Sequence, residues 1–219
     1  MAPPVPPVVW MTPPRGNVLV LAPHADDEAL GCGGAIALHC RQGDPVRIVF
    51  ATDGRAGDPL GHYANCDYRE VRRAEARKAG EILGVRDLTF WDYQDGKLAE
   101  VEDLADRLAR LLAVERPDVI YRPSVREVHP DHWALAVAVD RALETYRDAV
   151  APYAYEIWST VQPTHVIDIT AVWEQKQQAI EQYQSQVVYN DYLHKISGLN
   201  AYRAMYLPTA RYMEAFEVG

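Results

Sequence analysis

Two short polar clusters contain the side chains of this chain that are best suited to chemistry. One runs from His24 to Glu28 with the sequence HADDE, and the other runs from Glu127 to His132 with the sequence EVHPDH. Both combine imidazole with carboxylate groups, and these two ligand types bind zinc at ~2.0–2.2 Å. One cluster alone would be weak evidence, but two in one chain indicate a metal centre.

The spacing within the clusters is typical of a catalytic metal site rather than a structural one. His24 and Asp27 are three residues apart across an expected strand-to-helix turn, so both side chains can face one point. One histidine of the second cluster would complete a set of two histidines and one carboxylate, which leaves a position open for water. An aspartate in such a turn often caps the following helix. Capping would explain Asp26 or Asp27, but not both acids together with His24.

The flanking sequence predicts the elements that position these clusters. Short apolar runs alternate with helical patterns, which predicts an α/β protein with a Rossmann-like three-layer fold and a mostly parallel sheet. Sites in such sheets form at the carboxyl ends of strands, and the clusters follow the first and fourth predicted strands. The stretch after residue 186 is rich in tyrosine and has no assignable pattern. We expect strands at residues 17–22, 46–52, 87–91, 119–122, 153–158 and 165–168, and helices at residues 27–42, 67–83, 101–115, 132–147 and 171–185.

Length and composition limit the domain organisation. The 219 residues fit a single domain. Residues 1–16 include six prolines and predict an extended arm on the surface, which leaves residues 17–219 as one catalytic α/β domain. Cys32, Cys40 and Cys66 form no CxxC pair, so we expect neither a disulfide framework nor a cysteine-built zinc site.

Charge and hydropathy exclude several partners. The formal net charge of −9 argues against binding to nucleic acid or to an anionic membrane surface, since both need a basic footprint. The sequence has neither a signal-peptide pattern nor a run of about 18 apolar residues, which a membrane span requires. We therefore expect a cytoplasmic protein with a small-molecule substrate. The sequence does not indicate an oligomeric partner.

Several motifs occur in an order that resembles one enzyme family. They are HADDE at residues 24–28, TDGRAG at residues 52–57, Arg72 with Glu75, HPDH at residues 129–132, and Lys176 with Tyr183, Ser185 and Gln186. These motifs resemble the HPDDE, TDG, R-x-x-E, HPDH and K…Y-x-SQ motifs of the LmbE-like, or PIG-L-like, zinc-dependent de-N-acetylases. Ala25 replaces the usual proline, and Arg55 stands where an acid is common, which leaves substrate preference open.

The resemblance implies a hydrolase that removes an N-acyl group, in particular acetyl, from an amino sugar or sugar conjugate. His24, Asp27 and His132 would bind one zinc ion per chain, and Asp26 would be the general base for zinc-activated water. Two imidazoles and one carboxylate also suit iron(II). Zinc lowers the pKa of bound water to about 7, so a weak carboxylate base suffices.

The resemblance also suggests roles for polar residues around the metal. His129 would act as an imidazolium that donates a hydrogen bond to the tetrahedral oxygen, and Asp131 would accept from its other ring nitrogen. Arg55, His62 and Arg72 are candidates for contacts with substrate oxygens or a phosphate.

Three alternatives remain open from the sequence. One is an amide hydrolase that acts on a non-sugar substrate, because the metal centre needs only a carbonyl group. Another is a Rossmann-like nucleotide-binding module. It is disfavoured because the first strand is followed by no GxGxxG, and the glycine-rich stretch at residues 31–34 lies inside the predicted helix. The third is a structural metal-binding protein, which would need neither Asp26 nor His129.

Overall fold

The computed structural model describes residues 5–146, 150 and 152–218. Among these residues, no helix has the length and apolar character that crossing a membrane requires. The strands are β1 (Val8–Trp10), β2 (Val18–Ala22), β3 (Val46–Thr52), β4 (Asp87–Tyr93), β5 (Val119–Pro123), β6 (Pro152–Tyr155), β7 (His165–Asp168) and β8 (Met213–Glu217). The α-helices are α1 (Asp27–Gln42), α2 (Tyr68–Leu83), α3 (Leu104–Glu115), α4 (Pro130–Thr145), α5 (Trp173–Ile180), α6 (Gln184–Val187) and α7 (Tyr192–Arg203).

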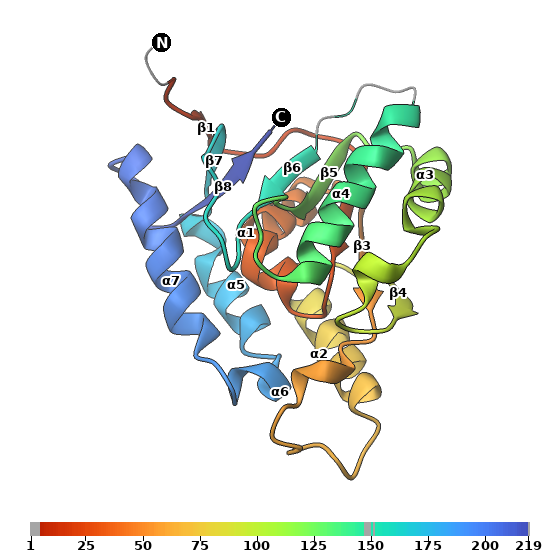
Figure 1. The fold of residues 1–219 in the computed structure, drawn as a ribbon. Coiled ribbons are helices and arrows are strands. Elements are labelled where there is room, and N and C mark those ends of the chain that lie inside the picture. The colour runs from red at the N-terminus through yellow and green to blue at the C-terminus, as the bar shows by residue number, and fades with distance from the viewer. Residues whose placement is uncertain (1–4, 147–149, 151, 219) are drawn as a thin grey trace.

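The strands form one eight-stranded sheet in the order β1-β7-β8-β6-β5-β2-β3-β4. Every pairing is parallel except those of β8, which runs antiparallel to both β6 and β7. The helices lie on both sides of the sheet, as Figure 1 shows. The predicted α/β fold with three layers and a mostly parallel sheet is confirmed.

Alternation of side chains along β2 shows how the layers are built. Val18, Val20 and Ala22 pack into the core shared with α1, α2 and α5, whereas Leu19 and Leu21 pack into the core shared with α3 and α4. All five residues are buried, because successive side chains of a strand point to opposite faces and both faces are covered.

The position of β2 explains where a site can form. From β2 the chain continues outward through β3 and β4 on one side, and it returns to place β5 and β6 on the other side. The strand order therefore reverses between β2 and β5. In open α/β sheets a crevice forms outside the carboxyl ends of the strands at such a switch point.

Most predicted elements agree with the structure, and the predictions at residues 27–42, 46–52 and 165–168 coincide with α1, β3 and β7. The predicted helix at residues 132–147 begins two residues earlier, because Pro130 is well suited to the first helical position. Its predicted end at Arg147 lies outside the described residues. Part of the proline-rich N-terminal stretch forms β1, which pairs with β7.

The prediction of one continuous helix at residues 171–185 was wrong. The chain forms α5, leaves the helical conformation at Tyr183 (φ −81°, ψ 55°), and then forms the single turn α6. The break lets Tyr183 donate a hydrogen bond to buried Glu28. It also lets Ser185 bond Glu75 through both its backbone N–H (2.8 Å) and its hydroxyl (2.6 Å). Tertiary contacts with α1 and α2 thus interrupt the helix that the sequence periodicity predicts.

Close packing of α1 against β6 gives a prediction about stability. A Cβ on Gly31 would lie 2.3 Å from the ring of Tyr155, which is fully buried, whereas a Cβ on Gly198 in α7 would meet no atom within 4 Å. We expect Gly31→Ala to lower the free energy of unfolding by about 1–3 kcal/mol through overpacking. Gly198→Ala, the matched control, should raise it by up to about 1 kcal/mol through helix propensity. Urea unfolding measures both, and equal effects would contradict the packing argument.

Candidate active site

A cavity of about 140 Å³ opens at the carboxyl ends of β2 and β5. Both predicted clusters line it: His24, Asp26 and Asp27 come from the β2–α1 turn, and His129 and His132 come from the start of α4. The two clusters are about 100 residues apart in sequence, and the parallel pairing of β2 with β5 brings them together. The structure therefore places the candidate chemical groups around one cavity.

The Asp27 carboxylate lies between two imidazoles. Its Oδ2 atom is 3.1 Å from His24 Nδ1 and 3.2 Å from His132 Nε2. Atoms that bind one tetrahedral zinc ion at ~2.0–2.1 Å lie about 3.3 Å apart, so these two separations are compatible with ligands to a common ion. Both ring nitrogens of His132 are buried without a hydrogen-bond partner among the described residues. His24, Asp27 and His132 therefore fit a metal ion.

Further carboxylates orient the two histidines from behind. His24 Nε2 lies 3.2 Å from Asp131 Oδ2 and 3.1 Å from Asp95 Oδ1, while His132 Nδ1 lies 3.6 Å from Glu127 Oε2. Metal-binding histidines generally direct their second ring nitrogen to such an acceptor, which fixes the tautomer and the ring orientation. His24 follows this pattern, while Glu127 lies just beyond hydrogen-bond distance of His132.

His24 also belongs to two other groups of possible ligands. One combines it with His129 and His132, and the other combines it with Asp95 and Asp131. In each group the donor atoms lie within 4.8 Å of one another. Asp27 lies 3.1 and 3.2 Å from His24 and His132 of the first group, whereas Asp131 of the second also accepts hydrogen bonds from two backbone N–H groups (2.7 and 3.0 Å).

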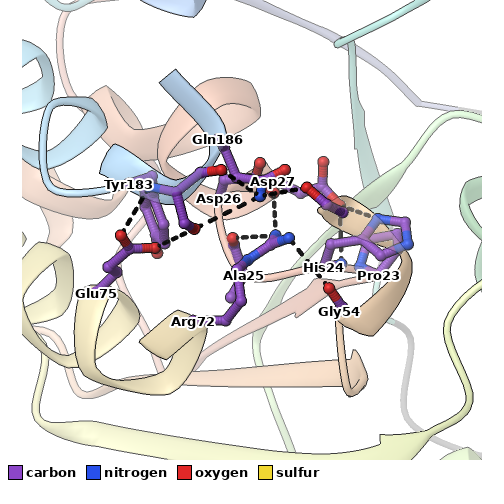
Figure 2. A network of polar contacts seen from close by, with 12 residues as sticks. Pro23, His24, Ala25, Asp26, Asp27, Gly54, Arg72, Glu75, Tyr183 and Gln186 are labelled. Atoms are coloured by element: carbon purple, nitrogen blue, oxygen red, sulfur yellow. Dashed lines mark hydrogen bonds and ion pairs between the residues drawn. The ribbon is translucent and has the colours of Figure 1, made fainter. Parts of the chain in front are cut away.

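Asp26 lies beside the candidate metal ligands in an unusual backbone conformation. Its φ of 151° is in the range that favours glycine, which costs on the order of 1–3 kcal/mol for another residue. Asp26 is the N-cap residue of α1, but its side chain makes no capping hydrogen bond, so helix capping does not explain it. The Arg72 guanidinium holds this turn by donating to the backbone carbonyl of Ala25 (2.6 Å) and to Asp26 Oδ1 (3.3 Å) (Figure 2).

The surroundings of Asp26 and Asp27 move their pKa values in opposite directions. Burial raises the pKa of Asp26 to about 7, although the positive charge of Arg72 opposes the shift. Burial would also raise the pKa of Asp27, but His132 and His24 hold it well below its usual range. Adjacent acids with separated pKa values are typical of sites in which one carboxylate stays ionised and the other exchanges a proton.

The contacts of His129 differ from those expected. Its Nδ1 accepts a hydrogen bond from the backbone N–H of Asp131 (3.3 Å), which makes His129 the cap of α4. The Asp131 carboxylate instead contacts His24, so it does not hold a charge on His129. Burial, and then repulsion by His24 and His132, lowers the pKa of His129. A neutral imidazole that accepts at Nδ1 carries its proton on Nε2 and can still donate one hydrogen bond.

Comparison with known proteins identifies the chain as a relative of deacetylases. Residues 19–143, more than half of the chain, match the family described as GlcNAc-PI de-N-acetylase (PIG-L). The chain belongs to the PIG-L family. The LmbE-like, or PIG-L-like, resemblance of the sequence motifs is therefore confirmed.

Three relatives show how widely this family's fold is used. The chain is 32% identical to the "Probable N-acetyl-alpha-D-glucosaminyl L-malate deacetylase 2" of Bacillus cereus, over 78% of this chain and 83% of the relative. It is 28% identical to the 4-oxalmesaconate hydratase of Pseudomonas putida, over 92% and 87% of the two chains. The crystal structure of the conserved protein TT1542 from Thermus thermophilus superposes with a TM-score of 0.80 at 28% identity, covering 93% of this chain and 94% of that protein.

The three residues expected to contact substrate lie in different places in this PIG-L family member. Arg72 is buried and lines the cavity. Arg55 is exposed and lies 3.5 Å from Asp53, and His62 is exposed and stacks on Tyr189. Neither Arg55 nor His62 is among the residues that line the cavity.

Sequence reasoning missed three residues of the cavity wall. Asp95 contacts His24, and Trp158 and Tyr192 face each other with ring centroids 6.1 Å apart. Asp95 follows the carboxyl end of β4. A search for polar side chains after every predicted strand, and not only after the first and fourth, would have found it. Trp158 and Tyr192 lie on irregular chain and at the start of α7, where the sequence has no polar cluster to mark them.

The geometry predicts one divalent ion per chain, held by His24, Asp27 and His132. We expect zinc-loaded protein to retain about one equivalent after dialysis and His132→Ala to lose it, since two protein ligands are too few for a stable site. Elemental analysis is the measurement. His194→Ala, which changes an exposed histidine of α7, is the control and should retain the ion. Equal metal content in the His132 and His194 variants would contradict the site.

Proposed function

We propose that this PIG-L family member hydrolyses the N-acetyl group of an amino sugar or a sugar conjugate with a divalent metal ion. The observation that carries the proposal is the pair of neighbouring acids: Asp27 faces two histidines, and Asp26 stands beside them held by Arg72. Metal binding alone would need Asp27 but no second carboxylate. The names of the family and of the Bacillus relative support an amide as the bond that is broken.

The bound metal would supply the Lewis acidity that activates water and polarises the amide carbonyl. Asp26 would take the proton of the attacking water and later give it to the leaving amine, which must be protonated to depart. His129 would donate from Nε2–H to the oxygen that becomes negative in the tetrahedral intermediate. Because Nδ1 of His129 accepts from the peptide N–H of Asp131, the neutral ring can fill this role without an imidazolium charge.

Zinc is the metal that we propose, as its catalytic sites combine three protein ligands of this kind with an open position. Iron(II) would accept the same ligands. Around the open position, Trp158 and Tyr192 offer aromatic surface on which a sugar ring can lie. Asp95 and Gln186 offer hydrogen-bonding groups for its hydroxyls.

The similarity to 4-oxalmesaconate hydratase supports a second candidate, namely metal-assisted hydration of an unsaturated carboxylic acid. An anionic substrate of that type needs free cationic groups. Arg72 is the one arginine or lysine among the cavity-lining residues that the structure describes, and it bonds Ala25, Asp26 and Gly54. The acids Asp26, Asp27 and Asp95 add negative charge to the same wall. Apart from the metal, the described cavity wall therefore offers no free cation to the carboxylate of an unsaturated acid, which favours deacetylation over hydration.

A substrate panel separates the candidates. We expect zinc-loaded protein to release free amine from N-acetylglucosamine conjugates, and a chelator to abolish the release. Amine release from non-sugar acetamides alone would indicate the broader amide hydrolase. Loss of ultraviolet absorbance from an unsaturated dicarboxylate, without amine release from any acetylated compound, would refute deacetylation in favour of hydration.

Substitution of the two adjacent aspartates tests the division of labour. Asp26→Asn keeps shape and removes basicity, so it should bind metal normally and lose turnover by roughly 10²–10⁴-fold, the usual contribution of positioned proton transfer. Asp27→Asn removes a charged ligand, so it should lose metal affinity first and regain part of its activity at high zinc. Titration with zinc and initial rates measure the two effects. Normal turnover by Asp26→Asn, or equal metal loss in both variants, would show that the roles are misassigned.

A further inference from the structure

The helix α1, which begins at the metal-binding turn, is interrupted in its second turn. Cys32 has non-helical dihedral angles (φ −142°, ψ 23°) and divides α1 into a first turn and a longer second part. The first turn carries Asp27 and Glu28. In a continuous α-helix, the Leu30 carbonyl would accept a hydrogen bond from the N–H of Gly34, four residues on. Beside the kink, each of these two buried backbone groups has a side-chain partner.

Two charged side chains satisfy these two groups. Lys176 Nζ donates to the Leu30 carbonyl (2.9 Å), and Glu214 Oε1 accepts from the Gly34 N–H (2.7 Å). Glu214 Oε2 accepts from the next N–H, that of Ala35 (2.8 Å). The two side chains also form an ion pair with each other, since Lys176 Nζ lies 2.7 Å from Glu214 Oε1. The ion pair thus bridges two backbone groups that a continuous helix would pair directly.

This ion pair, the α1 splint, is fully buried. Lys176 and Glu214 are 0% and 1% exposed, and the Lys176 ammonium donates its third hydrogen bond to Asn200 Oδ1 (2.9 Å). Stability alone does not account for such a pair, because well-packed apolar residues often replace buried ion pairs without loss. Directional hydrogen bonds to both sides of a kink are what apolar side chains cannot provide.

The glycines of α1 give independent support for the close approach. A Cβ on Gly33 would lie 3.3 Å from Lys176 Cγ, and a Cβ on Gly34 would lie 3.0 Å from Glu214 Oε1 and 2.5 Å from Ile169. The glycine-rich stretch at residues 31–34, which did not fit a nucleotide-binding motif, leaves room for the splint and its neighbours.

We propose that Lys176 and Glu214 are positioning residues that set the direction of the first turn of α1 and thereby place Asp26 and Asp27. Lys176 lies on α5, in the motif that resembles K…Y-x-SQ, and Glu214 lies on β8; both follow residues 19–143, which match the family model. The part of the inference that concerns metal and catalysis rests on the proposed function. The part that concerns the direction and rigidity of the turn does not.

Lys176→Met tests the splint by removing the ammonium while keeping the length of the side chain. We expect amide hydrogen exchange at residues 27–31 to become at least roughly tenfold faster in metal-free protein, because the Leu30 carbonyl loses its partner. The zinc dissociation constant should rise by roughly tenfold, the lower end of what supporting residues of metal sites contribute. Hydrogen–deuterium exchange with mass spectrometry and a competitive zinc titration are the measurements.

Two controls separate positioning from general stability. Leu112→Ala opens a cavity in the core on the opposite face of the sheet, and it should lower the melting temperature without changing exchange at residues 27–31 or zinc affinity. Asn200→Ala removes one bond of Lys176 but neither contact with α1, so it should also leave both readouts unchanged.

If Lys176→Met and Leu112→Ala show the same hydrogen exchange at residues 27–31 and the same zinc affinity, the proposal is overturned. The ion pair would then have a stabilising role only. If Lys176→Met does not fold, Glu214→Gln takes its place. It retains an oxygen for Lys176 and Gly34 but loses the acceptor of Ala35, so a smaller increase in both readouts is expected, and no increase overturns the proposal. Exchange is measured without metal or substrate, so it decides the positioning role even if the chain proves to have another activity.

Discussion

One oxygen atom of Asp27 faces an imidazole from each of the two loops that form the cavity, and the rest of the site is arranged around this contact. The support is reciprocal, since Asp27 of the first loop contacts His132 of the second, and Asp131 of the second contacts His24 of the first. Neither loop can move without disturbing a histidine on the other. The paired registers of β2 and β5 hold the starting points of both loops fixed.

Concentrating carboxylates at a buried point is unfavourable unless each one has a partner. Glu28 accepts from Tyr183, and Glu75 accepts from Ser185, so two acids near the first loop are satisfied by α6 and the residue that precedes it. Arg72 balances Asp26 and also bonds the backbone on which that residue is strained. The C-terminal third of the chain therefore supports a site whose reactive groups all lie in the first two thirds.

Much of this organisation was predictable because it depends on local patterns. The β2 and β3 strands are continuous apolar runs, and His24, Asp27 and His132 stand out at the ends of such runs. What the sequence did not reveal depends on contacts between distant segments. The break at Tyr183 and the pairing of Asp131 with His24 rather than His129 follow from tertiary contacts. Neither the helical periodicity of a segment nor the residue spacing within one motif indicates such contacts.

The placement of β8 has a consequence for biosynthesis. This strand, at residues 213–217, lies inside the sheet between β7 and β6, which are formed by residues 165–168 and 152–155. Before the ribosome has produced β8, the pair formed by β1 and β7 has no strand that joins it to the rest of the sheet. A nascent chain would therefore expose two strand edges, and such edges readily pair with other chains. The complete sheet can therefore form only after residues 213–217 have been synthesised.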